Sequence, residues 1–235
     1  MVIRPAIEKH LLQKDQKKEI KPTALWVSDI GYCPRKAMHR VLGFQPEREF
    51  PVELLEKFEY GKIYEELTGR ALKAEFGTDL VEQFRLETEI WHGNIDFLVS
   101  KPSPLLIEHK ATSDSGFNYI PKEEHLAQLV LYGQLFEELY HKSYQLVLVY
   151  RSWSHYAEFY VVDLGDKIQV DGEIDRKPIK GDFWFNVTKR RQVLEKWFNL
   201  QQLPTDYTKS DECEWQGRKN CNYFDACHSV KPGDF

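Results

Sequence analysis

The chain has 235 residues, with 32 Lys plus Arg against 37 Asp plus Glu and a formal net charge of −5 at pH 7. Hydrophobic residues make up 42% and aromatic residues 14%, which is ample for a packed core and excludes a disordered chain. No apolar run approaches the roughly 18 residues of a membrane span and no signal-peptide pattern is present, so we expect a cytoplasmic protein that does not enter membranes. The acidic balance excludes a nucleic-acid binder that is basic overall, but not one with a local basic groove.

The first third of the sequence predicts helices. Residues 1–22 mix charges of both signs and predict a surface helix or a loose arm. A short helix is expected after Cys33, because Pro34 suits a first helical position and Gly43 suits the position just past a helix end. Apolar residues recur at near-helical spacing over 51–76, which predicts one long amphipathic helix.

The remainder predicts a sheet with two more helices. Alternating or β-rich runs predict strands over 80–88, 95–99, 105–107, 145–150 and 157–162. Apolar stripes predict helices over 123–140 and 186–200. This order of elements predicts an α/β fold of the mixed α+β kind, in a single domain spanning 1–235 with its core at about 50–165.

One predicted strand pair brings two carboxylates together. If Val99 pairs with Leu105 across the turn, antiparallel pairing places Asp96 opposite Glu108. Period-two alternation then puts Lys110 on the same face as Glu108, while the residues next to Glu108 point to the other face. Two carboxylates and a lysine are therefore expected to converge.

Opposed like charges destabilise a sheet, so this pair needs a counter-charge or one protonated carboxyl group. Two carboxylates suit Mg²⁺ or Mn²⁺, which can activate water and stabilise negative charge on a phosphoryl group. Lys110 would orient the water or neutralise developing charge. The alternative is an ordinary salt bridge between Lys110 and a strand carboxylate at the end of a sheet.

These residues also carry a resemblance. The runs Gly93 to Asp96 and Glu108 to Lys110 resemble the Gly-x-x-Asp and Glu-x-Lys motifs of the PD-(D/E)XK nuclease superfamily. Gln128 and Tyr132, four residues apart and hence on one helix face, resemble the Gln-h-x-x-Tyr motif of its RecB-like branch. The resemblance implies a restriction-endonuclease-like core, with a central mixed sheet flanked by helices, and implies that this pair supports the site or a DNA strand.

Four cysteines lie near the two ends of the chain: Cys33, and then Cys213, Cys221 and Cys227. In a reducing compartment this set favours a ligand cluster over disulfides, although one buried cysteine and three incidental thiols are the alternative. The one-plus-three placement resembles the iron–sulfur signature of Cas4-type and AddB-type RecB-like nucleases. Four thiolates suit a [4Fe–4S] cluster or zinc, and the resemblance favours the cluster, in a module formed by about 28–45 and 205–228.

Two features depart from the family pattern. Seven residues separate Cys213 from Cys221, more than is usual in the family. Family members also place a metal-binding His on the helix before the sheet, where this sequence has Tyr64, and a neutral phenol is a poor ligand for Mg²⁺. A glutamate of this helix serves elsewhere in the superfamily, which makes Glu65 the candidate ligand and Glu66 its alternative. The remaining alternative is a site that binds its metal with fewer protein ligands and has lower activity.

The resemblance therefore implies a metal-dependent DNA exonuclease that acts on single-stranded or frayed DNA ends, alongside CRISPR adaptation, recombination or repair proteins. Asp96 and Glu108 would bind Mg²⁺ or Mn²⁺, the backbone carbonyl of His109 would complete the shell, and Lys110 would assist water attack. Two other interpretations stay open. One is a DNA-end-binding or scaffold relative whose lost metal site is marked by Tyr64; the other is a structural zinc protein with an incidental hairpin.

Overall fold

The computed structural model describes residues 3–16, 24–46 and 50–204, the pairs 214–215 and 218–219, and the single residues Cys221, Tyr223 and Cys227. Its helices are α1 (Ile3–Gln16), α2 (Pro34–Val41), α3 (Val52–Phe76), α4 (Glu123–Tyr140) and α5 (Val187–Leu200), with short 3-10 helices η1 (Val27–Gly31), η2 (Gly77–Asp79) and η3 (Asp114–Tyr119). Every predicted helix is thus confirmed. None of the helices in these ranges is both long and apolar enough to cross a membrane.

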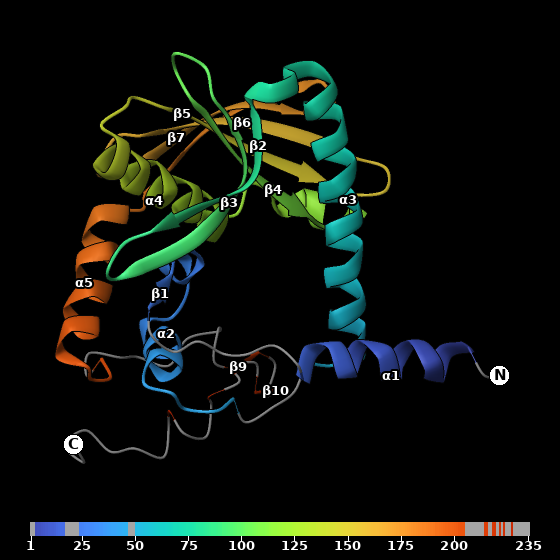
Figure 1. Ribbon diagram of the computed structural model, residues 1–235, viewed down its shortest axis with the longest axis vertical. Coiled ribbons are helices and arrows are strands. Elements are labelled where there is room, and N and C mark those ends of the chain that lie inside the picture. Colours follow the sequence, from blue (N-terminus) through green and yellow to red (C-terminus); the bar gives the residue numbers. More distant parts are fainter. Residues whose placement is uncertain are drawn as a thin grey trace.

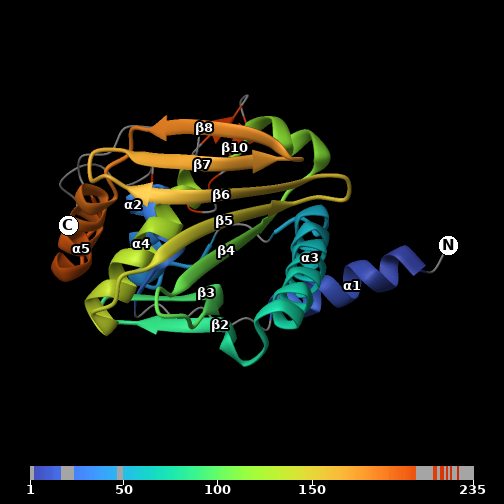
Figure 2. The ribbon, with the colours of Figure 1, turned by 90° about the horizontal axis from the view of Figure 1, so that it is seen from above.

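The strands of the main sheet are β1 (Leu25–Trp26), β2 (Leu80–Glu87), β3 (Trp91–Val99), β4 (Leu105–Ala111), β5 (Gln145–Arg151), β6 (Tyr156–Asp163), β7 (Ile168–Ile174) and β8 (Lys177–Phe183). They are ordered β1-β3-β4-β5-β6-β7-β8, and β2 pairs with β3 (Figure 2). The β1–β3 and β4–β5 pairs are parallel and the other pairs are antiparallel. Two further short strands, β9 (Glu214–Trp215) and β10 (Arg218–Lys219), pair with each other. The predicted mixed sheet flanked by helices is confirmed.

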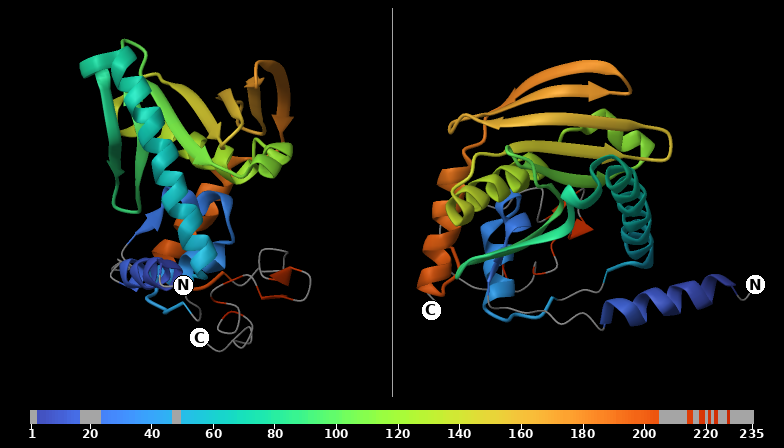
Figure 3. Two further views of the ribbon diagram at one scale, coloured as in Figure 1. Left: turned by 90° about the vertical axis from the view of Figure 1, so that its right-hand side faces the viewer. Right: turned by 45° about the horizontal axis from the view of Figure 1, so that its top comes forward.

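Helices α3 and α4 cover opposite faces of the sheet (Figures 1 and 3). On the α4 side lies the main core, to which β4 and β5 contribute Leu106 and Leu148. On the α3 side the same two strands contribute Ile107 and Val147 to a smaller cluster, against which Leu72 of α3 packs. Alternation along β4 therefore sends successive side chains into two different environments.

The predicted register of the β3–β4 hairpin is confirmed. Val99 pairs with Leu105, and Phe97 pairs with Ile107. The ladder ends there, one step before the expected partners Asp96 and Glu108. The Asp96 side chain takes a different contact with β4, described below.

The sheet extends beyond the predicted strands through the β7–β8 hairpin. Its turn residues Asp175 and Arg176 have positive φ angles of 48° and 66°, without the Asn-Gly or Gly-Gly signal that usually announces such a turn. Strand β8 is exposed along nearly its whole length, so it lacks the half-buried alternation by which strands are predicted.

Candidate active site

Five elements bring polar residues to one place beside the β3–β4 hairpin. Strand β4 contributes two of the predicted residues, and β3, α3 and α4 contribute one each: Glu108, Lys110, Asp96, Glu65 and Gln128. Strand β2 adds one residue that sequence reasoning missed, Gln83. The arrangement depends on alternation, because Glu108 and Lys110 share the face of β4 that meets α4.

Glu108, Lys110 and Gln128 form a closed hydrogen-bonded triangle. The Lys110 ammonium donates to Glu108 Oε1 at 2.6 Å and to Gln128 Oε1 at 3.0 Å. Gln128 Nε2 in turn donates to the same Glu108 oxygen at 2.8 Å. Glu108 is only 2% exposed, and its second oxygen, Oε2, is buried without a hydrogen-bond partner among the described residues. A buried acceptor of this kind suits a cation.

Asp96 joins the site through the backbone of β4. Its Oδ2 atom accepts a hydrogen bond from the His109 amide at 2.8 Å, and its Oδ1 atom accepts one from Gln83 Nε2 at 3.2 Å. The hydrogen bond from the His109 amide holds the Asp96 carboxylate beside Glu108, even though Asp96 and Glu108 are not paired in the β3–β4 ladder. The predicted convergence is therefore present, with a geometry set by a side chain-to-backbone contact.

On α3, Glu65 rather than Glu66 turns toward the site. Glu65 Oε1 accepts a hydrogen bond from Gln83 Nε2 at 2.7 Å. Glu66 is exposed and lies 3.4 Å from Arg70, one turn along its own helix. Of the two glutamates weighed from the sequence, Glu65 is the one that shares a hydrogen-bond donor with Asp96. Tyr64 precedes it on a half-buried part of the helix.

The charges of this cluster are unbalanced. Burial, followed by repulsion from Asp96, raises the pKa of Glu108 to about 8 in spite of Lys110. Burial also raises the pKa of Asp96, and burial together with repulsion from Asp96 raises the pKa of Glu65. Burial disfavours the charged form of Lys110, but the Glu108 and Asp96 carboxylates outweigh it and raise the pKa of the ammonium. Three carboxylates thus share one ammonium, and a divalent cation would relieve the excess negative charge.

Tyr132 supports the strand rather than the carboxylates. Its hydroxyl donates to the backbone carbonyl of Asn94 at 2.8 Å, and burial raises its pKa. A Cβ added to Gly93 would lie only 2.7 Å from the Tyr132 hydroxyl oxygen. Gly93, the glycine of the Gly-x-x-Asp motif, therefore lets helix α4 pack closely against β3. The two motifs are thus in direct contact.

His109 contributes its backbone, while its imidazole lies on the far face. The ring is buried on the α3 side, where burial, then Arg151 and Lys110, lower its pKa to about 4. Its amide holds Asp96, as described above. That its backbone carbonyl completes a metal shell stays a prediction.

The three described cysteines are all buried. Cys33 occupies the N-cap position of α2, and Cys221 and Cys227 lie in the carboxyl-terminal segment. Arg35, in the first turn of α2, donates to Cys227 Sγ at 3.2 Å and to its carbonyl oxygen at 3.2 Å. Cys227 therefore lies against the first turn of α2. That the two regions form a cluster module stays a prediction.

The structure does not place a preformed metal-binding group in the residues it describes, where no set of three His, Cys, Asp or Glu side chains has the arrangement to hold an ion. Cys213, the fourth predicted cluster ligand, lies outside these residues. At the carboxylate site, Gln83 engages Glu65 and Asp96. The donor types nevertheless fit a divalent cation, because Glu108 keeps a buried oxygen without a partner in the described part of the chain.

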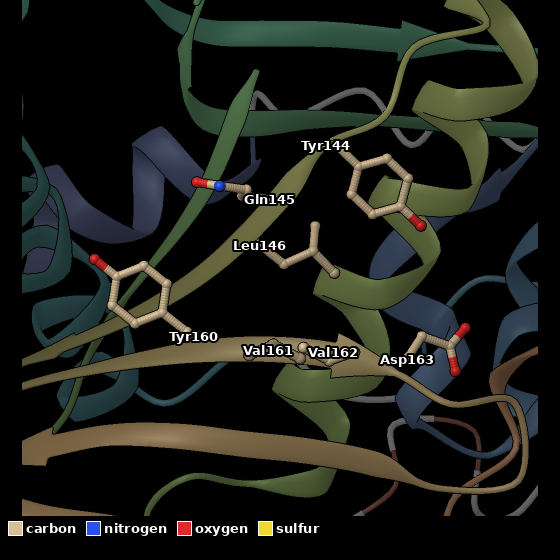
Figure 4. A pocket seen from close by; sticks show the side chains of 7 residues that line it. All are labelled: Tyr144, Gln145, Leu146, Tyr160, Val161, Val162 and Asp163. Carbon is tan, nitrogen blue, oxygen red and sulfur yellow. The ribbon is translucent and has the colours of Figure 1, made fainter. Parts of the chain in front are cut away.

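A separate shallow groove lies along β5 and β6, lined by Tyr144, Gln145, Leu146, Tyr160, Val161, Val162 and Asp163 (Figure 4). Its side chains do not converge, since Gln145 and Tyr160 point away from Tyr144 and Asp163 in that view. None of the predicted site residues lines it. Its polar groups lack the common focus found at the carboxylates.

Comparisons with known proteins add evidence on the fold. No protein-family model matches the chain, and no curated protein matches it. Among solved structures, the chain is similar to the crystal structure of a protein designated SSO0001, with a TM-score of 0.55 and 14% sequence identity over 99% of this chain and 98% of that one. At this identity the likeness shows the fold alone: a mixed α/β architecture shared over the full length of both chains.

Proposed function

We propose that the protein is a metal-dependent deoxyribonuclease that hydrolyses phosphodiester bonds at DNA ends. One observation carries the proposal: Asp96, Glu108 and Glu65 gather their carboxylates beside Lys110, and Glu108 Oε2 is buried there without a hydrogen-bond partner among the described residues. These three residues are the proposed ligands of Mg²⁺ or Mn²⁺. The sequence motifs that resemble PD-(D/E)XK nucleases support the same assignment.

A cation held there would supply Lewis acidity that stabilises charge on a phosphoryl oxygen and on an attacking water. The protein's own contribution is positioning. Lys110 has three N–H donors, and among the described residues Glu108 and Gln128 accept two of them. The third would donate to a water or a phosphate oxygen, where the ammonium would stabilise negative charge as the P–O bond breaks.

The same geometry explains how an acidic site tolerates an anionic substrate. Burial raises the pKa of Glu108, so ionisation of this carboxyl group needs a positive charge nearby. Ionised Glu108 and Asp96 would otherwise repel a phosphodiester. The carboxylates therefore require their counter-ion before DNA approaches.

We also propose that Cys33, Cys213, Cys221 and Cys227 hold a [4Fe–4S] cluster. Burial of the three described thiols and the Arg35 guanidinium on Cys227 Sγ support it, because a cation beside sulfur favours the thiolate form that binds metals. Anaerobic purification tests it: a brown protein with broad visible absorbance is expected, and a colourless protein that contains zinc would contradict it.

Degradation of end-labelled DNA with Mn²⁺ tests the nuclease. Asp96→Ala and Lys110→Ala should each abolish it. Lys180→Ala is the matched control, since Lys180 makes a pair of the same 2.6 Å length with Asp171 on the surface of β7–β8. Full activity in the first two variants would refute the assignment. DNA binding without cleavage in either Mg²⁺ or Mn²⁺ would favour the scaffold relative, and a time course of the label gives the polarity.

A further inference from the structure

Gln83 has a backbone conformation that is uncommon in a strand. Its φ angle is 51°, in the left-handed region, although it lies in the middle of β2 and carries a side chain. Its neighbours keep regular antiparallel pairing, with Glu82 opposite Phe97 and Phe84 opposite Ile95. The register is therefore continuous across Gln83, and the conformation inserts no extra residue.

The conformation coincides with a change of face in the β2–β3 ribbon. Phe97 and Ile95 are two residues apart and would share a face in a regular strand. Instead Phe97 belongs to the cluster beneath α3, whereas Ile95 belongs to the main core beneath α4. On β2, Leu80 and Leu86 divide between the same two clusters. The ribbon thus turns over at the level of Gln83 and its neighbour across the ribbon, Asp96.

At this point the Gln83 side chain joins two carboxylates that come from different elements. Its Nε2 group lies 2.7 Å from Glu65 Oε1 on α3 and 3.2 Å from Asp96 Oδ1 on β3. A carboxamide has two N–H donors, and this geometry gives one to each carboxylate. Asn94 Nδ2, 3.5 Å from Gln83 Oε1, fits the same amide orientation.

We infer that Gln83 is a positioning residue that holds Glu65 and Asp96 together before a divalent cation binds. The inference rests on the proposed function and extends it to a residue outside the family motifs. Two ionised carboxylates repel each other, and a neutral double donor between them reduces the separation that the repulsion would cause. The uncommon backbone conformation directs the Gln83 amide toward both carboxylates. Strained backbone conformations of this kind are frequent at functional sites.

Two variants separate this role from a purely structural one. Gln83→Ala removes the amide and keeps a Cβ in the left-handed conformation, whereas Gln83→Gly removes the amide and relieves that conformation. Thermal unfolding in EDTA should give Gln83→Gly a midpoint about 2–4 °C above that of Gln83→Ala. Isothermal titration with Mn²⁺ alone should show an affinity about tenfold or more below wild type in both variants, the usual loss when a residue that orients metal ligands is removed.

Arg176→Gly is the control, because Arg176 also has a positive φ angle, 66°, but lies in the β7–β8 turn rather than in the elements that form the site. It should raise the unfolding midpoint and leave Mn²⁺ affinity unchanged. If Gln83→Gly binds Mn²⁺ with wild-type affinity, the inference is overturned and the proposed function is not. A Gln83→Gly unfolding midpoint below that of Gln83→Ala would also overturn the inference, because loss of stability would then explain the loss of Mn²⁺ affinity. A wild-type protein that binds no Mn²⁺ would overturn the proposed function together with the inference.

Discussion

Neighbouring residues on the two faces of strand β4 are buried to a similar extent but have chemically different surroundings. Glu108 faces α4 and His109 faces α3; they are 2% and 6% exposed, and each has one buried atom without a hydrogen-bond partner among the described residues. Burial favours the neutral form of both, so it raises the pKa of Glu108 to about 8 and lowers that of His109 to about 4. Only Glu108, however, has an ammonium and two further carboxylates beside it. A shifted pKa therefore does not mark a site by itself; the convergence of charged groups does.

The largest effect expected from this comparison is on catalysis. Glu108→Gln keeps the shape of the side chain and removes its charge, so loss of a cation worth several kcal/mol to the reaction should lower the rate of DNA degradation. The loss corresponds to about 10²–10³-fold. His109→Leu, which suits the apolar α3 face, should stay within a few-fold of wild type. Mn²⁺-dependent digestion of labelled DNA measures both, and an equal loss in His109→Leu would break the distinction between the faces.

The two faces should also give opposite dependences of stability on pH. Glu108 has a raised pKa in the folded state, so its contribution to stability is complete below about pH 4.5 and is lost as the pH rises through about 8. His109 has a lowered pKa, so its contribution is complete above about pH 6.5 and is lost as the pH falls through about 4. Between pH 4.5 and 6.5 a rise in pH removes the Glu108 contribution to stability and restores the His109 contribution, so the two effects oppose each other. Above pH 6.5 only the loss from Glu108 continues.

Thermal unfolding scans in EDTA across pH 4 to 9 measure these terms. The wild-type midpoint should fall between pH 6.5 and 8, and Glu108→Gln should flatten that fall. His109→Leu should instead flatten the fall on the acid side. Added Mn²⁺ should remove the alkaline fall in the wild type, because a cation stabilises ionised Glu108. An alkaline fall that persists in Glu108→Gln would show that another group causes it.

The comparison also shows what the sequence could predict. The β3–β4 register and the α4 boundaries follow from local alternation and helical periodicity, so Glu108 and Lys110 could be placed on one face from the sequence alone. Only the motif resemblance implied that Gln128 joins them. The site depends equally on Gln83, whose backbone conformation no sequence pattern announces. Its position is polar and exposed, which is ordinary for a residue of a strand at the edge of a sheet. Tertiary contacts with Glu65 and Asp96, not local preference, define its role.

A smaller effect is expected where α4 supports the strand of the site. Gly93→Ala would place a Cβ 2.7 Å from the Tyr132 hydroxyl oxygen, and overpacking of this kind costs about 1–3 kcal/mol. Tyr132→Phe removes the hydrogen bond to the Asn94 carbonyl and should cost about 1 kcal/mol. Urea denaturation of both variants and of the double variant measures the coupling. Because Tyr132→Phe removes the clashing oxygen, the double variant should lose less than the sum of the single variants, and simple additivity would mean that the two motifs are independent.

The smallest effect comes from a pair that resembles the site in distance alone. Lys180 lies 2.6 Å from Asp171, the same separation as Lys110 from Glu108, but its side chain is 75% exposed whereas that of Lys110 is 23% exposed. Water screens the surface pair, so Lys180→Ala should change the free energy of unfolding by no more than about 0.5 kcal/mol. Lys110→Ala removes the ammonium that donates to Glu108 and Gln128 in a buried site, so it should cost more, about 1.5–3 kcal/mol. Urea denaturation at pH 7 compares the two variants, and a Lys180→Ala loss as large as that of Lys110→Ala would mean that distance, rather than burial, determines what these pairs contribute.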